Sequence, residues 1–381
     1  MLSDVLVLDL SLYLPGPFAT QVMADLGARV IKVEPPAGDP VRHLPPHDAA
    51  GMAAAFRAIN RGKESLAIDL KQAAGRALLL DLVERADVLV EGFRPGVLER
   101  LGLGAEVCQA RNPRLIYASI TGFGQTGPYR DKAGHDINYM AYAGALSLTT
   151  DAEGLPAVPG LQSADLLGAF SALAGILAAL HERTRTGVGR RIDASLHDAA
   201  LVAQSVHLAA HRAGQRAEPR AMPLNGGLPG YGVYRSRDGH ALALGALEPK
   251  FWATFCEIVG REDWVARQLD PSLREEVAAL FATRDRDEWR VILENAEVCF
   301  APALDYDQAL SDPHVLARGL VGAAGFAPPV RFEPPAPGAD PDRLAPFAER
   351  TGQHGPALVR ELLGLDDEQV AALIEGGALR A

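Results

Sequence analysis

The chain has 381 residues, of which 48% are hydrophobic and 22% charged, and its formal net charge is -11. This length predicts two compact units, and the composition is typical of a soluble globular protein rather than a disordered or fibrous one. The negative charge and the absence of a basic run argue against nucleic-acid binding. Three scattered cysteines without a CxxC motif indicate neither a disulfide framework nor a thiolate metal site.

Short apolar or β-branched runs alternate with helical stretches through the first half of the chain. The expected strands cover residues 5–10, 29–34, 86–93, 114–120 and 190–196. This rhythm predicts a parallel α/β sheet buried on both faces.

The targeting features of the sequence favour a cytoplasmic protein. The opening MLSDVLVLDL has no basic region before its apolar stretch, unlike a signal peptide. The longest apolar run, residues 166–180, is shorter than the roughly 18 residues needed to span a bilayer. We therefore expect a buried helix there and no membrane span.

The pattern of apolar and polar residues changes in the second half of the chain. Residues 197–224 predict a linker helix, and from 225 the sequence alternates like a hairpin with its turn at Asp238-Gly239. A small α+β domain is expected over 225–320, followed by a proline-rich linker over 321–344.

The tail is expected to return to the first domain. Residues 355–381 have a helical pattern, with Asp366 and Asp367 as plausible caps. The predicted fold is thus α/β, with a Rossmann-like parallel-sheet large domain over 1–196, completed by 345–381, and the smaller α+β domain.

The common cofactor motifs are absent from the sequence. The first turn, SLYLPGPFAT, has no GxGxxG and places prolines where pyrophosphate would be cradled, so Glu34 is not expected to bind a nicotinamide ribose. No P-loop, GxSxG or HExxH occurs, and His43 and His47 lack a spaced third ligand. We expect neither a metal nor a separate cofactor.

Two residues remain as candidates for chemistry. His135, in KAGHDINYMAYAG, could be a base, a metal ligand or a turn residue before a helix. Asp165, in LQSADLLGAF, could be a first-turn helix acid or a functional carboxylate. Neither position alone decides between these alternatives.

Six blocks in a fixed order resemble the family III CoA-transferases, also called the CaiB/BaiF family, and within it the α-methylacyl-CoA racemases. They are LPGPFATQVMADLGARVIKVEPPAGDPVR (14–42), NRGKESLAIDLK (60–71), ADVLVEGFRPGVLERLGLG (86–104), TGFGQTGPYRDKAGHDINY (121–139), SADLLGAF (163–170) and GALEPKFW (245–252). The resemblance extends through nearly the whole chain, and it implies an interlaced homodimer.

The resemblance also bears on the reaction. Transferases of the family typically have an aromatic residue in place of His135 and use the aspartate matching Asp165 as a nucleophile. The racemase pattern GHDINY is intact here, and Glu248 matches a carboxylate that orients the histidine. The run of four glycines that shields the transferase intermediate is reduced to Asn225-Gly226-Gly227. The resemblance therefore implies a racemase, with a CoA-transferase as the second candidate and a non-catalytic acyl-CoA-binding protein as the third.

The chemistry of inversion independently fits a pair of acid-base groups. Inverting the carbon next to a thioester needs a base on one face, an acid on the other and an enolate between them, and His135 and Asp165 can form this pair. Backbone N–H groups at the start of the helix carrying Asp165 are candidates to stabilise the enolate oxygen. CoA is then part of the substrate.

By resemblance, CoA would be bound by Arg42, Lys63, Arg94 and Tyr139, and cationic side chains suit its phosphates. Pro95 stiffens the loop that carries Arg94. Solvated surface charge remains an equal alternative for Arg42 and Lys63. The sequence leaves the acyl group open among steroid side chains, branched fatty acids and aryl-propionyl groups.

Overall fold

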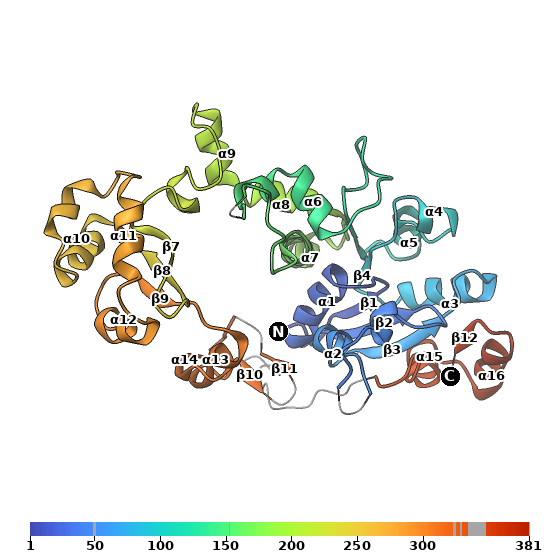
Figure 1. Cartoon of the computed structure of the whole chain (residues 1–381). Helices are drawn as coiled ribbons and strands as arrows, with labels where there is room; N and C mark the ends of the chain where they lie inside the picture. Colours follow the sequence, from blue (N-terminus) through green and yellow to red (C-terminus); the bar gives the residue numbers. More distant parts are fainter. Residues whose placement is uncertain (49–50, 152, 323–324, 328–329, 334–347, 381) are drawn as a thin grey trace. The chain divides into compact units, whose positions relative to one another are not determined.

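The computed structural model describes residues 1–48, 51–151, 153–322, 325–327, 330–333 and 348–380. The chain divides into two compact units (Figure 1). The first comprises Met1–Ala143, Pro159–Ala203 and Pro313–Ala381, and the second comprises Gly144–Val158 and Gln204–Asp312. Residues 144–158, which were expected in the large domain, thus belong to the second unit.

The first unit is built on a seven-stranded sheet of order β12-β3-β2-β1-β4-β5-β6. Its strands are β1 (Leu6–Asp9), β2 (Arg29–Glu34), β3 (Glu64–Ile68), β4 (Val88–Glu91), β5 (Ile116–Thr121), β6 (Arg191–Ser195) and β12 (Leu379–Arg380). All neighbours are parallel except β12, which pairs antiparallel with β3. The predicted parallel sheet is confirmed, and the order 3-2-1-4-5-6 is that of a doubly wound fold.

Alternating side chains of the strands enter two separate cores. Val7 pairs in register with Val30 and Val88 on one face, and Leu8 pairs with Ile31 and Leu89 on the other. Helices cover both faces, which explains why these strands are almost continuously apolar.

The helices of the first unit are distributed over the two faces of the sheet. The first core includes residues of α1 and α7, and the second includes residues of α3, α5, α15 and α16. In Figure 1, the C-terminal α15 and α16 lie beside β3 and β12. The helices are α1 (Pro15–Asp25), α2 (Ala54–Asn60), α3 (Ala73–Val83), α4 (Val97–Arg100), α5 (Ala105–Arg111), α6 (Asp136–Tyr142), α7 (Ser163–Thr186), α8 (Leu196–Val202), α14 (Pro313–Ala317), α15 (Gly355–Leu363) and α16 (Asp367–Glu375), with a short η1 (Pro40–His43).

Helix α7 extends beyond the apolar run that predicted it and has 24 residues. By length and composition it is the one described helix that could cross a membrane. However, Ala169, Ala172 and Ile176 are buried in the first core. This burial is what a core helix of a globular domain requires.

The second unit combines a three-stranded antiparallel sheet with short helices. Its sheet has the order β7-β8-β9, and its core gathers Trp252, Trp264 and Trp289. Its elements are η2 (Ala145–Leu148), α9 (Ser205–Arg212), η3 (Pro223–Asn225), β7 (Tyr231–Arg235), β8 (Ala241–Gly245), α10 (Pro249–Ile258), η4 (Glu262–Arg267), α11 (Leu273–Phe281), α12 (Arg286–Leu293), β9 (Phe300–Pro302) and α13 (Tyr306–Leu310). The predicted hairpin is confirmed, with Gly239 at a φ of 86° in its turn.

Two connecting segments differ from the prediction. The prediction of a single linker helix over 197–224 is wrong, because α8 and α9 are separate helices that lie in different units. Within the expected proline-rich linker, β10 (Val321–Gly322) and β11 (Gly325–Phe326) pair as a short antiparallel ladder, and the rest of it from 334 on lies outside the described residues.

Candidate functional site

A cavity of about 500 Å³ lies at the carboxyl ends of the strands in the first unit. Its walls come from residues 11–16 after β1, 92–95 after β4, 120–123 around the end of β5, and the loop 130–139. Strands β1 and β4 are neighbours whose connections run in opposite directions along the sheet. The carboxyl ends at such a switch point are where open α/β sheets bind ligands.

His135 is held at this cavity by the start of α6. It is the N-cap residue of the helix, and its backbone N–H donates a 3.0 Å hydrogen bond to Asn138 Oδ1. The Asn138 backbone N–H in turn donates to the His135 carbonyl at 2.8 Å. The HDIN spacing therefore fixes the backbone of His135 and leaves its side chain exposed and lining the cavity.

Asp165 reaches the same cavity from the first turn of α7. Its backbone N–H donates a 3.0 Å hydrogen bond to Asp136 Oδ1, so the start of α7 is tied to the start of α6. Burial raises the pKa of the Asp165 carboxyl to about 7, and the nearby Asp136 charge acts in the same direction. Near neutral pH this carboxyl is therefore present in both protonation states.

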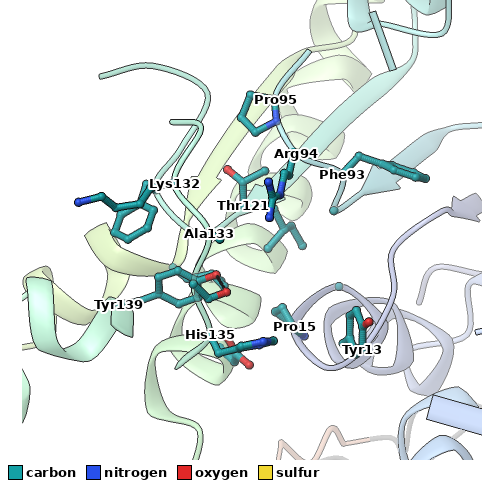
Figure 2. Close-up of a pocket in the computed structure, with 18 of the residues that line it drawn as sticks. Tyr13, Pro15, Phe93, Arg94, Pro95, Thr121, Lys132, Ala133, His135 and Tyr139 are labelled. Atoms are coloured by element: carbon teal, nitrogen blue, oxygen red, sulfur yellow. Dashed lines mark hydrogen bonds between the residues drawn. The ribbon is translucent and has the colours of Figure 1, made fainter. Parts of the chain in front are cut away.

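The two candidate groups thus share one cavity and come from two linked helices. In Figure 2 the His135 imidazole points toward the start of α1, where Pro15 and Tyr13 are drawn, and Arg94 and Thr121 lie above them in this view. A site that combines an imidazole with a partly buried carboxyl of pKa near 7 is suited to proton transfer.

Tyr139 forms part of the cavity wall, and both its hydroxyl and its ring make contacts that stabilise the fold. Its hydroxyl donates to the Gly134 carbonyl, and its ring is buried. A Cβ on Gly122 would lie 2.4 Å from Tyr139 Cε1, so a side chain at 122 would displace the ring. Burial raises the pKa of the Tyr139 phenol to about 12. Tyr139 therefore shapes the cavity wall, and its expected contact with CoA remains a prediction.

Arg94 lines the cavity on the loop after β4 and is exposed. The buried Glu91 at the end of β4 accepts the Phe93 N–H at 2.8 Å, which fixes the beginning of this loop. Burial raises the pKa of Glu91 to about 7. The position of Arg94 suits an anionic ligand.

The Arg42 guanidinium is buried and hydrogen-bonded within the protein. Its Nε and Nη2 donate to the two carboxylate oxygens of Glu34 at 2.7 Å each, and Nη1 donates to the Ala348 carbonyl at 3.0 Å. The guanidinium also lies 4.0 Å from the Phe56 ring centroid. Because it is buried in these contacts, Arg42 loses support as a CoA-binding residue.

Lys63 is likewise buried. Its Nζ contacts Asp9 Oδ2 at 3.0 Å, the Pro17 carbonyl at 2.8 Å and Thr20 Oγ1 at 2.8 Å. Burial lowers the pKa of this ammonium to about 8. The contacts join the end of β1 to α1, and Lys63 is buried. Lys63 therefore loses support as a direct CoA ligand, and it is not the solvated surface charge that was the alternative.

A second cavity, of about 640 Å³, lies over the carboxyl ends of β1, β2 and β3. Leu12 and Phe93 border both cavities. Its walls are mostly apolar, and its charged residues are the cations Lys71 and Arg100 and the carboxylates Glu34 and Asp69. The Glu34 carboxylate is already paired with Arg42. One elongated ligand with an apolar portion and phosphates could occupy both cavities.

Glu248 lies in the second unit, where it is the N-cap residue of α10. Its carbonyl accepts the Trp252 N–H at 3.1 Å, as the first hydrogen bond of the helix. Its proposed action on His135 remains a prediction.

Several residues that line these cavities were not predicted from the sequence. Tyr13, Arg130 and Lys132 line the first, and Lys71 and Arg100 line the second. Lys71 could have been found from its place just after a strand, but the strand ESLAI was itself not predicted. Arg130 and Lys132 come from an irregular loop whose path has no sequence period.

Comparison with known proteins gives the class of enzyme. A family model described as CoA-transferase family III matches residues 2–331. The chain belongs to this family.

Individual relatives carry both activities of the family. The chain is 38% identical over 325 residues to "Alpha-methylacyl-CoA racemase" of Homo sapiens, covering 84% of this chain and 81% of the relative. It is 31% identical over 393 residues to "Succinyl-CoA:glutarate CoA-transferase" of Homo sapiens, covering 99% and 90%. A solved CAIB/BAIF family protein from Brucella suis superimposes with a TM-score of 0.81 at 30% identity, covering 95% of this chain and 99% of that one.

Proposed function

We propose that the protein is an α-methylacyl-CoA racemase, which interconverts the two epimers of 2-methylacyl-CoA thioesters by proton transfer through an enolate. The observation that carries this proposal is that His135 and Asp165 line one cavity, on helices joined by the Asp165 to Asp136 hydrogen bond.

The protonation of Asp165 supports a racemase over a transferase. A group that removes a proton in one direction and returns it in the other must be available in both forms, which a pKa of about 7 allows near neutral pH. A carboxylate nucleophile needs only its ionised form, for which burial is a disadvantage.

The proposed reaction conserves all atoms. One group of the pair takes the proton from the α-carbon, the electrons of the broken C–H bond move onto the thioester oxygen, and an enolate forms. The other group then gives its proton to the opposite face of the α-carbon. His135 is the base toward one epimer and Asp165 the base toward the other.

Two of the backbone N–H groups at the start of α7, which were expected to stabilise the enolate oxygen, already have hydrogen-bond partners. The Asp165 N–H at the start of α7 already donates to Asp136, and the Ser163 N–H donates to the Leu161 carbonyl at 2.9 Å. These two groups are therefore not free to bind an oxyanion.

The substrate would extend over both cavities. The acyl group and thioester fit the cavity with His135 and Asp165, and the CoA arm passes Leu12 and Phe93 into the second cavity. The phosphates of CoA would be bound by Arg94, which lines the first cavity, and by Lys71 and Arg100, which line the second. No further cofactor is part of this proposal. A homodimer with interlaced subunits and a cytoplasmic location also belong to it, and sedimentation of the purified protein tests the dimer.

A family III CoA-transferase that works through Asp165 is the second candidate. It is favoured by the likeness to the human succinyl-CoA:glutarate CoA-transferase, which covers nearly the whole chain. Asp165 would then carry the acyl group and CoA in turn.

One experiment separates the two candidates. A single epimer of a 2-methylacyl-CoA is incubated with the protein in D₂O, without an acceptor acid. Epimerisation with deuterium at the α-carbon is the result that the racemase proposal predicts. If CoA transfer occurs only after a second carboxylic acid is added, and no epimerisation is found, the transferase replaces it.

A further inference from the structure

Tyr13, on the turn between β1 and α1, has an unusual backbone conformation. Its φ is 63°, in the left-handed region, and among the described residues only Arg220 and Cys299 share a positive φ without being glycine. Side chains with a Cβ are strained there, and a bulky aromatic residue is a rare occupant. Glycine or asparagine would satisfy the same turn at lower cost.

The tyrosine ring does not recover this cost by burial. Tyr13 is 53% exposed, although aromatic rings stabilise a fold mainly when they are buried. Neither local backbone preference nor core packing therefore accounts for a tyrosine at this position. Strained residues of this kind gather where a ligand is held.

The ring stands at the end of the site where the acyl group is proposed to react. Tyr13 lines the first cavity together with His135 and Asp165, whereas the preceding Leu12 borders both cavities. In Figure 2, Tyr13 is drawn beside Pro15 on the side toward which the His135 imidazole points.

We propose that Tyr13 is a specificity-determining residue whose ring packs against the acyl group, favouring acyl groups with an aromatic ring or a bulky apolar branch near the α-carbon. This inference rests on the proposed reaction at His135 and Asp165. An apolar acyl group would cover the half-exposed ring, and an aromatic one would also gain an edge-to-face or offset contact.

Three variants separate the ring from the backbone. Tyr13→Asn removes the ring while keeping a residue that tolerates the left-handed conformation, and Tyr13→Gly does the same with full relief of strain. Tyr13→Phe keeps the ring and removes the hydroxyl. Both ring-deleting variants should melt at the same or a higher temperature than the original protein, which shows that the fold is retained.

The test measures exchange of the α-proton in D₂O for a 2-arylpropionyl-CoA and for propionyl-CoA. The ratio of kcat/KM for the aryl substrate to that for propionyl-CoA should fall about tenfold in Tyr13→Asn and Tyr13→Gly and stay unchanged in Tyr13→Phe. An unchanged ratio in both ring-deleting variants overturns the inference. A loss of affinity for free CoA as large as the loss of kcat/KM for the aryl substrate, measured by calorimetry, also overturns the inference, because the ring would then bind the CoA arm. Absence of exchange in the original protein with both substrates would instead refute the proposed function.

Discussion

The backbone N–H of Asp165 donates a 3.0 Å hydrogen bond to the carboxylate of Asp136, the residue that follows His135. This contact joins the first turns of α6 and α7, and it also brings a second negative charge close to the Asp165 carboxyl. Asp136 therefore has two separable effects on the proposed acid-base pair, one on its position and one on its protonation.

Substitution of Asp136 should separate these effects. Asp136→Asn keeps an oxygen acceptor but removes the charge, so the pKa of Asp165 should fall and the pH-rate limb that reports it should move to lower pH. Asp136→Ala also removes the acceptor, and we expect a loss of about tenfold to 100-fold in racemisation because the geometry of the pair is no longer fixed. Identical pH-rate profiles for the three proteins would contradict both effects.

The raised pKa of Asp165 should make its ionisation costly to the fold. Its pKa in the folded protein is about 7 against an ordinary 3.8, so the folded state holds a proton that the unfolded state has lost between these values. Stability should therefore fall as pH rises from about 4 to 7. Asp165→Asn lacks this penalty and should be more stable at pH 8 by about 1 to 3 kcal/mol, with the difference vanishing near pH 4. Urea unfolding at the two pH values measures it, and an equal difference at both would contradict the burial of this carboxyl.

Arg94 should contribute to CoA affinity through contact with an anionic group. Calorimetry of CoA with Arg94→Ala should show binding weaker by about tenfold, because a charge-assisted hydrogen bond is lost. Arg94→Lys should recover only part of this, since an ammonium lacks the planar fork of a guanidinium. Arg42→Lys is a matched control at a buried arginine outside the cavity lining, and its CoA affinity should not change. Full affinity in Arg94→Ala would remove Arg94 from the site.

Glu248 should act on turnover rather than on binding if it orients the His135 imidazole. Glu248→Gln keeps the size of the side chain but removes the charge that favours one tautomer, so kcat should fall by about tenfold or more while KM changes little. A normal kcat would leave Glu248 with no role beyond its N-cap position in α10 and would withdraw one support of the racemase proposal.

The first strand was predicted from the nearly continuous apolar run VLVLDL at 5–10, because burial on both faces leaves a clear pattern. The strand Glu64–Ile68 was missed because ESLAI is short and begins with two polar residues, and Leu379–Arg380 is too short to leave a period. His135 and Asp165 were predicted from residue type and motif, and both line the first cavity. Arg42 and Lys63 have the same residue types as surface or ligand-binding cations, and only tertiary structure reveals their carboxylate partners, Glu34 and Asp9.

The sequence could not have identified the conformation of Tyr13 or the contact between Asp136 and Asp165. The Tyr13 conformation is imposed by the turn that leads from β1 into α1. The contact between Asp136 and Asp165 joins two residues that are 29 positions apart in the chain. Both depend on how the elements pack rather than on local propensity.

In the proposed mechanism, His135 and Asp165 serve opposite faces of the α-carbon. The most direct measurement is α-proton exchange in D₂O by His135→Ala and Asp165→Asn, each with the separate epimers of a 2-methylacyl-CoA and followed by mass spectrometry. Both variants should lose inversion, by about 100-fold or more, yet each should still exchange the α-proton of the one epimer that faces its remaining base. The two variants should therefore retain exchange for opposite epimers. Retention for the same epimer in both variants, or an acyl adduct trapped on Asp165 of the original protein with only Asp165→Asn inactive, would contradict it.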